Sequence, residues 1–252
     1  MIVAAHQPHY FPWLGFFDKM AKVDRFILMD EVQLTYRSRM FRNKFLTKSG
    51  NERYLTVSFS REGFMNKSFT EVPVNTHVDW QVDHANFLKD TYGKTPGFKE
   101  IWPRIEPVFT TQYQFVSDVA LDSVAIMKDL LDIPTETVLQ SSLTYDHSAV
   151  RNGLILALCQ AAHADSYLCG RGAQSYMEID TFDAVGITVV YQSLESLVYP
   201  QISSQEFVPG LSALDLLFNC GITQGRAMFW DNVRASSDWQ LRTVPEPGSQ
   251  TT

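Results

Sequence analysis

The sequence opens with the stretch IVAAHQPHYFPWLGFFDKMAKVDRFILM, residues 2–29, and this stretch decides the fold. Ile2–Ala5 is apolar without alternation, which is typical of a strand buried on both faces. A helix is expected over Leu14–Lys22 and a second strand over Arg25–Met29. Strand, helix and strand together take about 30 residues, the length of a βαβ unit. We therefore expect a parallel sheet.

The second half of the chain alternates in the same way. Strands are expected at Glu136–Leu139, Ser166–Cys169 and Ile187–Tyr191, separated by helices at Ser148–Ala162 and Ile179–Ala184. Strands that alternate with helices indicate parallel pairing, because each crossover helix returns the chain to the same end of the sheet. The predicted fold class is α/β, a largely parallel, Rossmann-like sheet flanked by helices.

Residues 32–59 predict a β-hairpin insertion, with a turn at Gly50-Asn51 and a strand over Tyr54–Phe59. Basic residues from Arg37 to Lys48 would give it a local positive face, and arginine offers bidentate geometry to phosphate oxygens. A charged, exposed hairpin that binds no ligand is the alternative. The candidate substrate contacts of this segment are Gln33, Arg37, Arg42 and Asn43.

Residues 76–132 predict a helical segment that closes with a long helix over Phe115–Leu131. Pro103 and Pro107 interrupt the periodic stretch before that helix, which predicts two short turns in place of one helix. The aromatic-rich part of the segment, Tyr92–Tyr113, could supply an interface in a homo-oligomer.

Three further signals mark helix ends. Thr76 with Asp79, and Ser212 with Asp215, have the spacing of a capping box, in which two side chains bond to the free backbone groups of a helix start. Gly221 stands where a glycine commonly ends a helix.

Length and composition limit the possible classes. With 252 residues, 45% of them hydrophobic, the chain can bury a substantial core, and we expect a single domain over residues 1–235 and a polar tail over residues 236–252. The net charge of −7 excludes a generic binder of polyanions. Three widely spaced cysteines predict neither a disulfide framework nor a zinc site. No run approaches the ~18 apolar residues of a membrane span, so we expect a cytoplasmic protein without a membrane partner.

The loop after the first strand carries the strongest chemical signal. His6 and His9 follow the strand directly, at the end where parallel sheets bind ligands, and Pro8 and Pro12 stiffen the loop. An imidazole there can donate to a phosphate or take a proton from an amine or hydroxyl. A purely structural loop, whose histidines bond to nearby carbonyls, is the alternative. Gln7, Tyr10 and Trp13 are the candidate substrate contacts of this loop.

Polar residues also follow two later strands. Asp30 leaves the second strand at the edge where His6 leaves the first, so it is expected to orient an imidazole as the third catalytic residue. After the strand Ser166–Cys169, Gly170 and Gly172 would let backbone amides approach an oxyanion or a phosphate. Cys169 itself is more typical of inert packing than of a nucleophile. Weaker candidate substrate contacts are Tyr176, Tyr199 and Gln201.

Taken together, these motifs resemble the WbqC-like family of bacterial proteins. The resemblance rests on blocks that extend to about residue 221: His6-Gln7-Pro8-x-Tyr10-x-Pro12-Trp13-x-Gly15-Phe16, Asp30-x-Val32-Gln33, Arg42-Asn43-Lys44, Leu55-Thr56-Val57, Tyr167-Leu168-x-Gly170, Tyr176, and Tyr199-Pro200-Gln201 through Phe207 to Ser212-x-x-Asp215-Leu216-Leu217-Phe218-Asn219-x-Gly221. The chain departs from the family at Ser58, where proline is common, and at Cys169, where serine is frequent; the second departure weakens the case for Cys169 as a nucleophile.

The resemblance implies a tailoring enzyme of surface-polysaccharide (O-antigen) or related biosynthesis. The implied reaction transfers an aminoacyl group, such as glycyl, to the amine of a nucleotide-activated amino sugar. The donor would be held on a carrier protein or a tRNA, and no cofactor is implied. His6 or His9 would then take the proton of the attacking amine.

The first block is more distantly similar to nucleotidyltransferase-type α/β domains, in which paired histidines bind the phosphates of ATP. That likeness gives the alternative function, nucleotidyl or adenylyl transfer with ATP and Mg²⁺. The His-x-Gly-His motif of that group is missing from this chain. A non-catalytic module that binds a sugar or a carrier is the third possibility.

Overall fold

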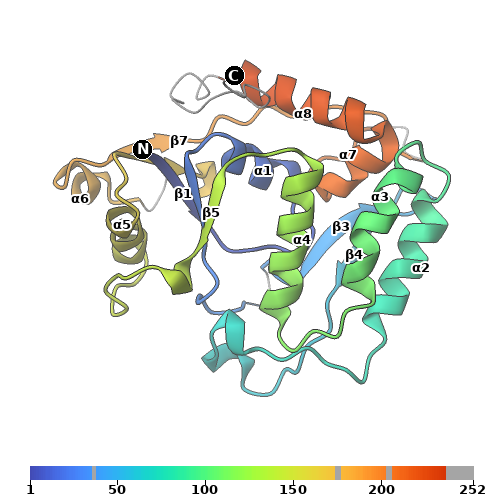
Figure 1. Cartoon of the computed structure of the whole chain (residues 1–252), viewed down its shortest axis with the longest axis horizontal. Coiled ribbons are helices and arrows are strands. Elements are labelled where there is room, and N and C mark those ends of the chain that lie inside the picture. Colours follow the sequence, from blue (N-terminus) through green and yellow to red (C-terminus); the bar gives the residue numbers. More distant parts are fainter. Residues whose placement is uncertain (36–37, 174–176, 203–205, 237–252) are drawn as a thin grey trace, which may run out of the picture.

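A computed structural model describes residues 1–35, 38–173, 177–202 and 206–236. Its centre is a five-stranded parallel sheet with the strand order β5-β2-β1-β6-β7 (Figure 1). The parallel α/β sheet predicted from the sequence is confirmed, and every predicted strand of it is present within one residue. The strands are β1 Ile2–His6, β2 Arg25–Leu28, β5 Glu136–Leu139, β6 Ser166–Cys169 and β7 Thr188–Tyr191.

Helices cover both faces of the sheet. Side chains alternate between two hydrophobic cores along β1, with Ala4 in the larger core and its neighbours Val3 and Ala5 in the smaller one. The larger core is formed with α1 Leu14–Ala21, α2 Trp80–Tyr92, α3 Phe98–Ile105, α4 Val116–Leu130, α7 Ala213–Cys220 and α8 Ile222–Ala235. The smaller core is formed with α5 Asn152–Ala161 and α6 Ile179–Asp183. β1 is therefore buried on both faces, as its unbroken apolar run predicts.

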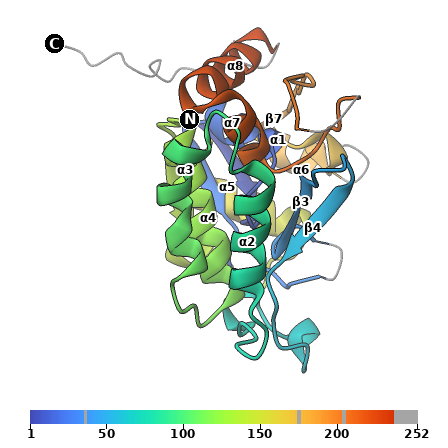
Figure 2. The same cartoon turned by 90° about the vertical axis from the view of Figure 1, so that its right-hand side faces the viewer.

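The insertion is a two-stranded antiparallel hairpin of β3 Arg42–Leu46 and β4 Glu52–Thr56. It lies beside α2, which runs next to α3 and α4 (Figure 1 and Figure 2). The predicted turn at Gly50 is confirmed, because its amide donates to the Thr47 carbonyl at 2.9 Å. The strand begins and ends earlier than the predicted Tyr54–Phe59, since its partner β3 already starts opposite Thr56.

The helical segment differs from the prediction at its prolines. The long helix Phe115–Leu131 is confirmed as α4. α3, however, continues through Pro103, because Ile101, Trp102 and Ile105 are buried and their packing outweighs one missing backbone hydrogen bond. Pro107 lies near the start of the short 3₁₀ helix Glu106–Phe109, where its missing N–H costs little.

The aromatic residues of this segment face inward. Tyr92, Trp102 and Phe109 are all buried in the larger core of their own chain. These three are used within the protomer, while Phe98 and Tyr113 are half-buried, and the interface between copies stays a prediction.

The predicted capping boxes are both wrong, for different reasons. α2 begins at Trp80 rather than after Thr76, because the Asn75 side chain accepts the His77 amide and makes a turn there. Ser212 does cap α7, since its hydroxyl accepts the Leu214 amide at 3.3 Å. Asp215 does not complete that box. Its carboxylate accepts a hydrogen bond from the buried hydroxyl of Tyr92 at 2.7 Å.

Two helices in the second half of the chain differ from the predicted ones. α5 starts at Asn152 rather than Ser148, because the Ser148 amide and hydroxyl both donate to Asp146 in a turn. Gly221, with φ of 78°, ends α7 as expected, but the whole of α8 follows it and was not predicted. The polar tail falls almost entirely outside the described residues. In the part that is described, no helix is both long enough and apolar enough to cross a membrane.

A buried polar network locks α1 against the end of β7. Asp18 and Lys22 form an ion pair at 2.9 Å, and both side chains are at most 2% exposed. The Gln192 amide nitrogen donates to the Asp18 carboxylate at 2.6 Å and to the Gly15 carbonyl at 2.9 Å, while the Lys22 ammonium donates to the carbonyl of Ser193 at 2.6 Å. The position of α1 over the sheet is therefore set by charge as well as by packing.

Removal of one partner should expose the energetic cost of this network. Asp18→Ala removes the carboxylate that faces the buried Lys22 ammonium at 2.9 Å, so we expect the free energy of unfolding to fall by about 3–5 kcal/mol. Asp90→Ala is the matched control, since its ion pair with Lys48 is exposed and should be worth about 1 kcal/mol or less. Urea denaturation measures both. Equal losses in the two variants would show that the buried pair does not anchor α1.

Candidate functional site

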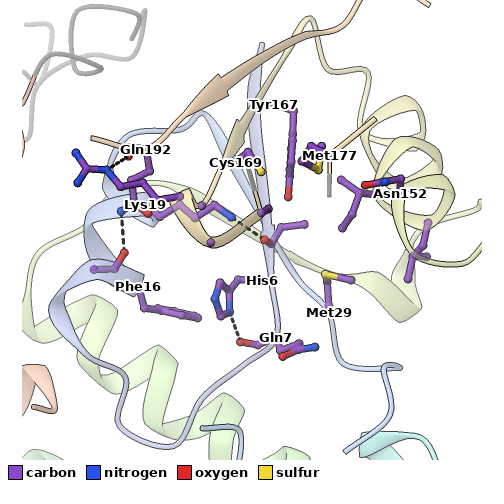
Figure 3. A pocket seen from close by; sticks show the side chains of 18 of the residues that line it. His6, Gln7, Phe16, Lys19, Met29, Asn152, Tyr167, Cys169, Met177 and Gln192 are labelled. Atoms are coloured by element: carbon purple, nitrogen blue, oxygen red, sulfur yellow. Dashed lines mark hydrogen bonds between the residues drawn. The ribbon is translucent and has the colours of Figure 1, made fainter. Parts of the chain in front are cut away.

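A cavity of about 990 Å³ opens at the carboxyl ends of β1 and β6. In chain order the five strands lie 3-2-1-4-5, so connections leave β1 and β6 in opposite directions and the two strands form the topological switch point of the sheet. The cavity has the size of a site for a substantial small molecule. Figure 3 shows His6, Gln7 and Phe16 on one side of it and Tyr167, Met177 and Asn152 on the other.

The hydrogen-bond ladder between β1 and β6 is short, and this shapes the cavity floor. The two strands pair only at Ile2 with Ser166 and Val3 with Tyr167. The carbonyls of Ile2 and His6 accept amides on the β2 side, so alternation directs the carbonyl of Ala5 toward β6. That carbonyl accepts a hydrogen bond from the Lys19 ammonium at 3.0 Å (Figure 3). Lys19 thus occupies the gap where the ladder has ended.

His6, at the last position of β1, lines the cavity and is half-buried. Its Nδ1 lies 2.9 Å from the Gln7 carbonyl oxygen. Because a carbonyl can only accept, Nδ1 carries the hydrogen and Nε2 keeps the lone pair in the neutral ring. Burial and the nearby Lys19 ammonium lower the pKa of His6 to about 4, with the Gln7 contact opposing them. The ring is therefore neutral at pH 7, with one nitrogen able to accept a proton.

His9 lies behind His6 and outside the cavity lining. The two rings meet edge to face, with centroids 4.7 Å apart, and both pack on Phe16. Burial lowers the pKa of His9 well below its ordinary value, and His6 and Arg39 add to the effect. Of the two predicted bases, His6 is the one that lines the cavity.

The loop between β1 and α1 is held rigidly. Ser123 of α4 accepts the Phe11 amide at 2.9 Å and donates to the His9 carbonyl at 3.2 Å. The Tyr10 amide donates to the Arg39 carbonyl at 3.2 Å. The structure thus bears out a loop fixed by its surroundings as well as by its prolines.

The cations of the cavity come from residues that the sequence analysis missed. Lys19, Arg151 and Arg171 line it, against a single carboxylate, Glu178, among the described lining residues. Arg151 adopts φ of 53° and ψ of −122°, a strained backbone for a residue with a side chain. The Nε of Arg171 donates a hydrogen bond to the Gln192 carbonyl oxygen at 3.1 Å. In an acidic protein this local excess of positive charge favours an anionic ligand.

Another part of the cavity lining is apolar. This apolar wall consists of Met29, Leu154, Ile155, Tyr167 and Met177. Gly170 and Gly172 also line the cavity and have open space where a Cβ would be, so a ligand can approach their backbone. Such a cavity suits a ligand with one flat apolar part and one charged part.

The cysteines are poor nucleophiles in this setting. Burial raises the pKa of Cys169, which lines the cavity but is only 1% exposed, and raises that of Cys159 to about 12. A thiol rather than a thiolate is therefore present at pH 7.

Asp30 lies at the same edge of the sheet as His6, but it bonds to the short 3₁₀ turn that follows β5. Its two carboxylate oxygens accept the amide and the hydroxyl of Ser141, at 3.0 and 2.6 Å. The His6 hydrogen bond instead goes to Gln7. The structure therefore gives Asp30 the role of fixing the turn after β5 and brings it to neither imidazole.

Among the described residues, the hairpin cations do not line the cavity, and acids neutralise some of them. Lys44 pairs with Glu52 at 2.8 Å, and Arg53 pairs with Asp83 of α2 at 2.7 Å. Arg42 stacks over the Tyr54 ring at 4.9 Å and lines a separate hollow between the hairpin and α2. The expected positive face is thus only partly paired with acids.

The other predicted contacts divide between the cavity and the scaffold. Gln7, Trp13, Gly170 and Gly172 line the cavity. The remaining described residues have structural partners: Gln33 bridges to Ser68, the Asn43 amide donates to the Phe11 carbonyl, the Tyr10 hydroxyl bonds to His84, and Gln201 bonds to the backbone of Val208. Arg37 and Tyr176 lie outside the described residues.

Tyr199 belongs to a buried cluster around Asp215. Burial raises the pKa of Asp215 to about 6, an effect that hydrogen bonds from Tyr92 and then Tyr199 limit. The folded protein therefore holds a proton at this carboxyl at pH values where the unfolded chain has released it.

The sign of the resulting pH dependence follows from linkage. As the pH rises from about 4 to about 6, the unfolding free energy should lose roughly 3 kcal/mol through Asp215 and then stay level. Asp215→Asn should remove this contribution while keeping an acceptor for Tyr92. Urea denaturation of both proteins between pH 4 and 7, with Asp90→Asn as an exposed control, measures the difference. Parallel profiles for wild type and Asp215→Asn would contradict the assignment.

A second pH-dependent property lies in the cavity itself. His6 should titrate near pH 4 in the intact protein, and Lys19→Met should raise its pKa, because a neighbouring cation is removed. NMR of the imidazole resonances between pH 3 and 8 follows both. A His6 ring that titrates at its ordinary value in the wild type would show that water and anions already reach it freely.

Comparison with known proteins points to one family. A family model described as the WbqC-like protein family matches residues 7–227. The uncharacterized protein Rv1507c of Mycobacterium tuberculosis is 30% identical over 221 residues, which cover 87% of this chain and 94% of that protein. No solved structure matches the chain.

Proposed function

Because the chain belongs to the WbqC-like family, and because its cavity joins a neutral imidazole to a cluster of cations, we propose that it is a transferase acting on a nucleotide-linked amino sugar. The transferred group is an aminoacyl group such as glycyl, and the acceptor is the amine of the sugar. The observation that carries the proposal is the Nε2 lone pair of His6 in a large cavity at the switch point.

The apolar and the charged parts of the cavity lining suit different parts of the substrate. The apolar wall of Tyr167, Ile155 and Met177 suits a nucleobase, and the cations suit its phosphates. The sugar would then lie between them, near His6 and the backbone of Gly170 and Gly172.

The reaction can be written with its atoms balanced. The neutral sugar amine attacks the carbonyl carbon of an aminoacyl thioester or ester, and a C–N bond forms. Nε2 of His6 accepts the amine proton, and the C–S or C–O bond to the carrier breaks as the tetrahedral intermediate collapses. The departing thiolate or alkoxide then takes the proton from His6, which restores the neutral ring. Backbone amides near Gly170 are placed to receive the carbonyl oxygen as it becomes negative.

Nucleotidyl transfer is the second candidate, and the strand order favours it. A first strand at the centre of a 3-2-1-4-5 sheet, ending in two imidazoles, fits a site that binds a nucleoside triphosphate. Such a reaction uses Mg²⁺, which prefers carboxylate oxygens. Asp30, the acid expected at this edge, is engaged by Ser141, and Glu178 is the one carboxylate among the described lining residues. Aminoacyl transfer needs no carboxylate to hold a metal and is preferred.

The test is turnover in a His6 variant. His6→Ala should lower kcat by ~10²-fold or more, the usual size of a general-base contribution, with little change in melting temperature. His77→Gln, an exposed histidine on the turn before α2, is the matched control. The assay follows the mass gain of a nucleotide amino sugar incubated with a glycyl-carrier thioester or glycyl-tRNA. Full activity in His6→Ala would end the assignment, and pyrophosphate release from ATP in place of acyl transfer would favour the second candidate.

A further inference from the structure

Helix α1 carries two buried lysines with different surroundings. Lys22 forms the ion pair with Asp18 described above. Lys19 is only 4% exposed, yet within the described residues its ammonium has a single hydrogen bond, to the Ala5 carbonyl, and no carboxylate within ion-pair distance. A buried ammonium without a counter-charge is strongly unfavourable, so proteins seldom retain one without a use.

The Lys19 ammonium is directed at the cavity and not into packing. It lies at the gap between the carboxyl ends of β1 and β6 and lines the cavity together with His6 (Figure 3). One of its three N–H groups is used by Ala5, which fixes the ammonium in place. The ammonium also lies 5.6 Å from the centre of the Tyr167 ring, and it can donate its remaining N–H groups to an acceptor from a ligand. Arg151 and Arg171 reach the same cavity from the α5 and β6 sides.

We propose that Lys19 binds a phosphate oxygen of the nucleotide-linked substrate, and that Arg151 and Arg171 contact the remaining oxygens of its diphosphate. The choice of a diphosphate rests on the proposed function and on the number of cations, since three positive groups face one carboxylate in the lining. A single carboxylate ligand would leave two of them unmatched. Phosphate oxygens supply the several acceptors that an ammonium and two guanidinium groups require.

Substrate binding at Lys19 would also act on His6. The groups that face His6 are Lys19 from α1 and His9 from its own loop, and His9 in turn faces Arg39. Lys19 keeps most of its charge at pH 7, because burial lowers its pKa only to about 8. A phosphate on Lys19 offsets the positive charge that weakens the imidazole as a base. The substrate would therefore raise the basicity of the group that accepts its proton.

The test is binding of inorganic pyrophosphate to the full chain by calorimetry without added metal. Lys19→Met keeps the length of the side chain and removes its charge, and Lys19→Gln keeps an N–H for the Ala5 carbonyl. Both should weaken pyrophosphate binding at least 10-fold. Lys94→Met, an exposed lysine after α2, should leave it unchanged within 2-fold. In the wild type, pyrophosphate should also raise the pKa of His6 measured by NMR, and this rise should vanish in Lys19→Met.

Several results would overturn the proposal. One is the absence of pyrophosphate binding to the wild type at millimolar concentration, and another is equal binding to the wild type and both Lys19 variants. A third is binding of glycine, used as a carboxylate probe, that depends on Lys19 while pyrophosphate binding does not.

Failure of the inference and failure of the proposed function give different results. Lys19-dependent pyrophosphate binding without acyl transfer would retain this site and reject the reaction. Acyl transfer with an unchanged KM for the nucleotide sugar in Lys19→Met would retain the reaction and reject this site.

Discussion

The early end of the ladder between β1 and β6 is the constraint on which the site depends. In a parallel sheet each strand carbonyl normally finds an amide on the neighbouring strand. Pairing stops at Val3 and Tyr167, so the carbonyl of Ala5 points to a neighbour that no longer offers an amide. A buried carbonyl must still be satisfied, and the ammonium of Lys19 satisfies it. The same gap gives the cavity its floor and leaves His6 beside it.

Filling this gap with Lys19 requires α1 to be held in one position over the sheet. Lys19 can reach Ala5 only if the helix keeps its rotation and height over the sheet. Apolar residues of the helix fill the larger core, but hydrophobic contact alone permits small shifts. The directional bonds among Asp18, Lys22 and Gln192 fix the helix to the end of β7. The scaffold and the site therefore share one helix, in which Lys22 pairs with Asp18 while Lys19 faces no carboxylate among the residues that the structure describes.

The part of this arrangement that is local in sequence could be predicted. Short β-rich segments that alternate with helical patterns predicted the five strands, and the positions of His6 and Gly170 at strand ends predicted which edge they share. Long-range pairing could not be predicted: Arg53 meets Asp83 across 30 residues, and Asp30 meets Ser141 across 111. Such partners depend on how helices and turns pack, which no spacing reveals. The hairpin therefore looked like a positive face although α2 neutralises part of it.

Lys19 was missed for a more instructive reason. A helical lysine is usually exposed, so a single lysine among apolar neighbours attracts no attention. Phe16, Phe17, Met20 and Ala21 lie on one face of the helix, and Asp18, Lys19 and Lys22 lie on the other, which is the pattern of a helix with one face in water. In the structure the polar face is buried as well. The sequence therefore held no signal that set Lys19 apart, because its burial depends on what packs over that face.

In the protein without a ligand, the Lys19 ammonium and the His6 imidazole lie in a site that disfavours a positive charge on either of them. Lys19 disfavours a charge on His6, and the low polarity of the site disfavours the charge on Lys19 itself. A bound anion would stabilise the charge on Lys19 and would make protonation of His6 less unfavourable. The strained backbone of Arg151, with its positive φ, adds to the free energy of the unliganded site. Sites of this kind are tolerated where binding relieves them, because the free energy released on binding is then available to align the reacting groups. Under the proposed function, an anion bound at Lys19 would therefore relieve the charge conflict that keeps His6 a weak base.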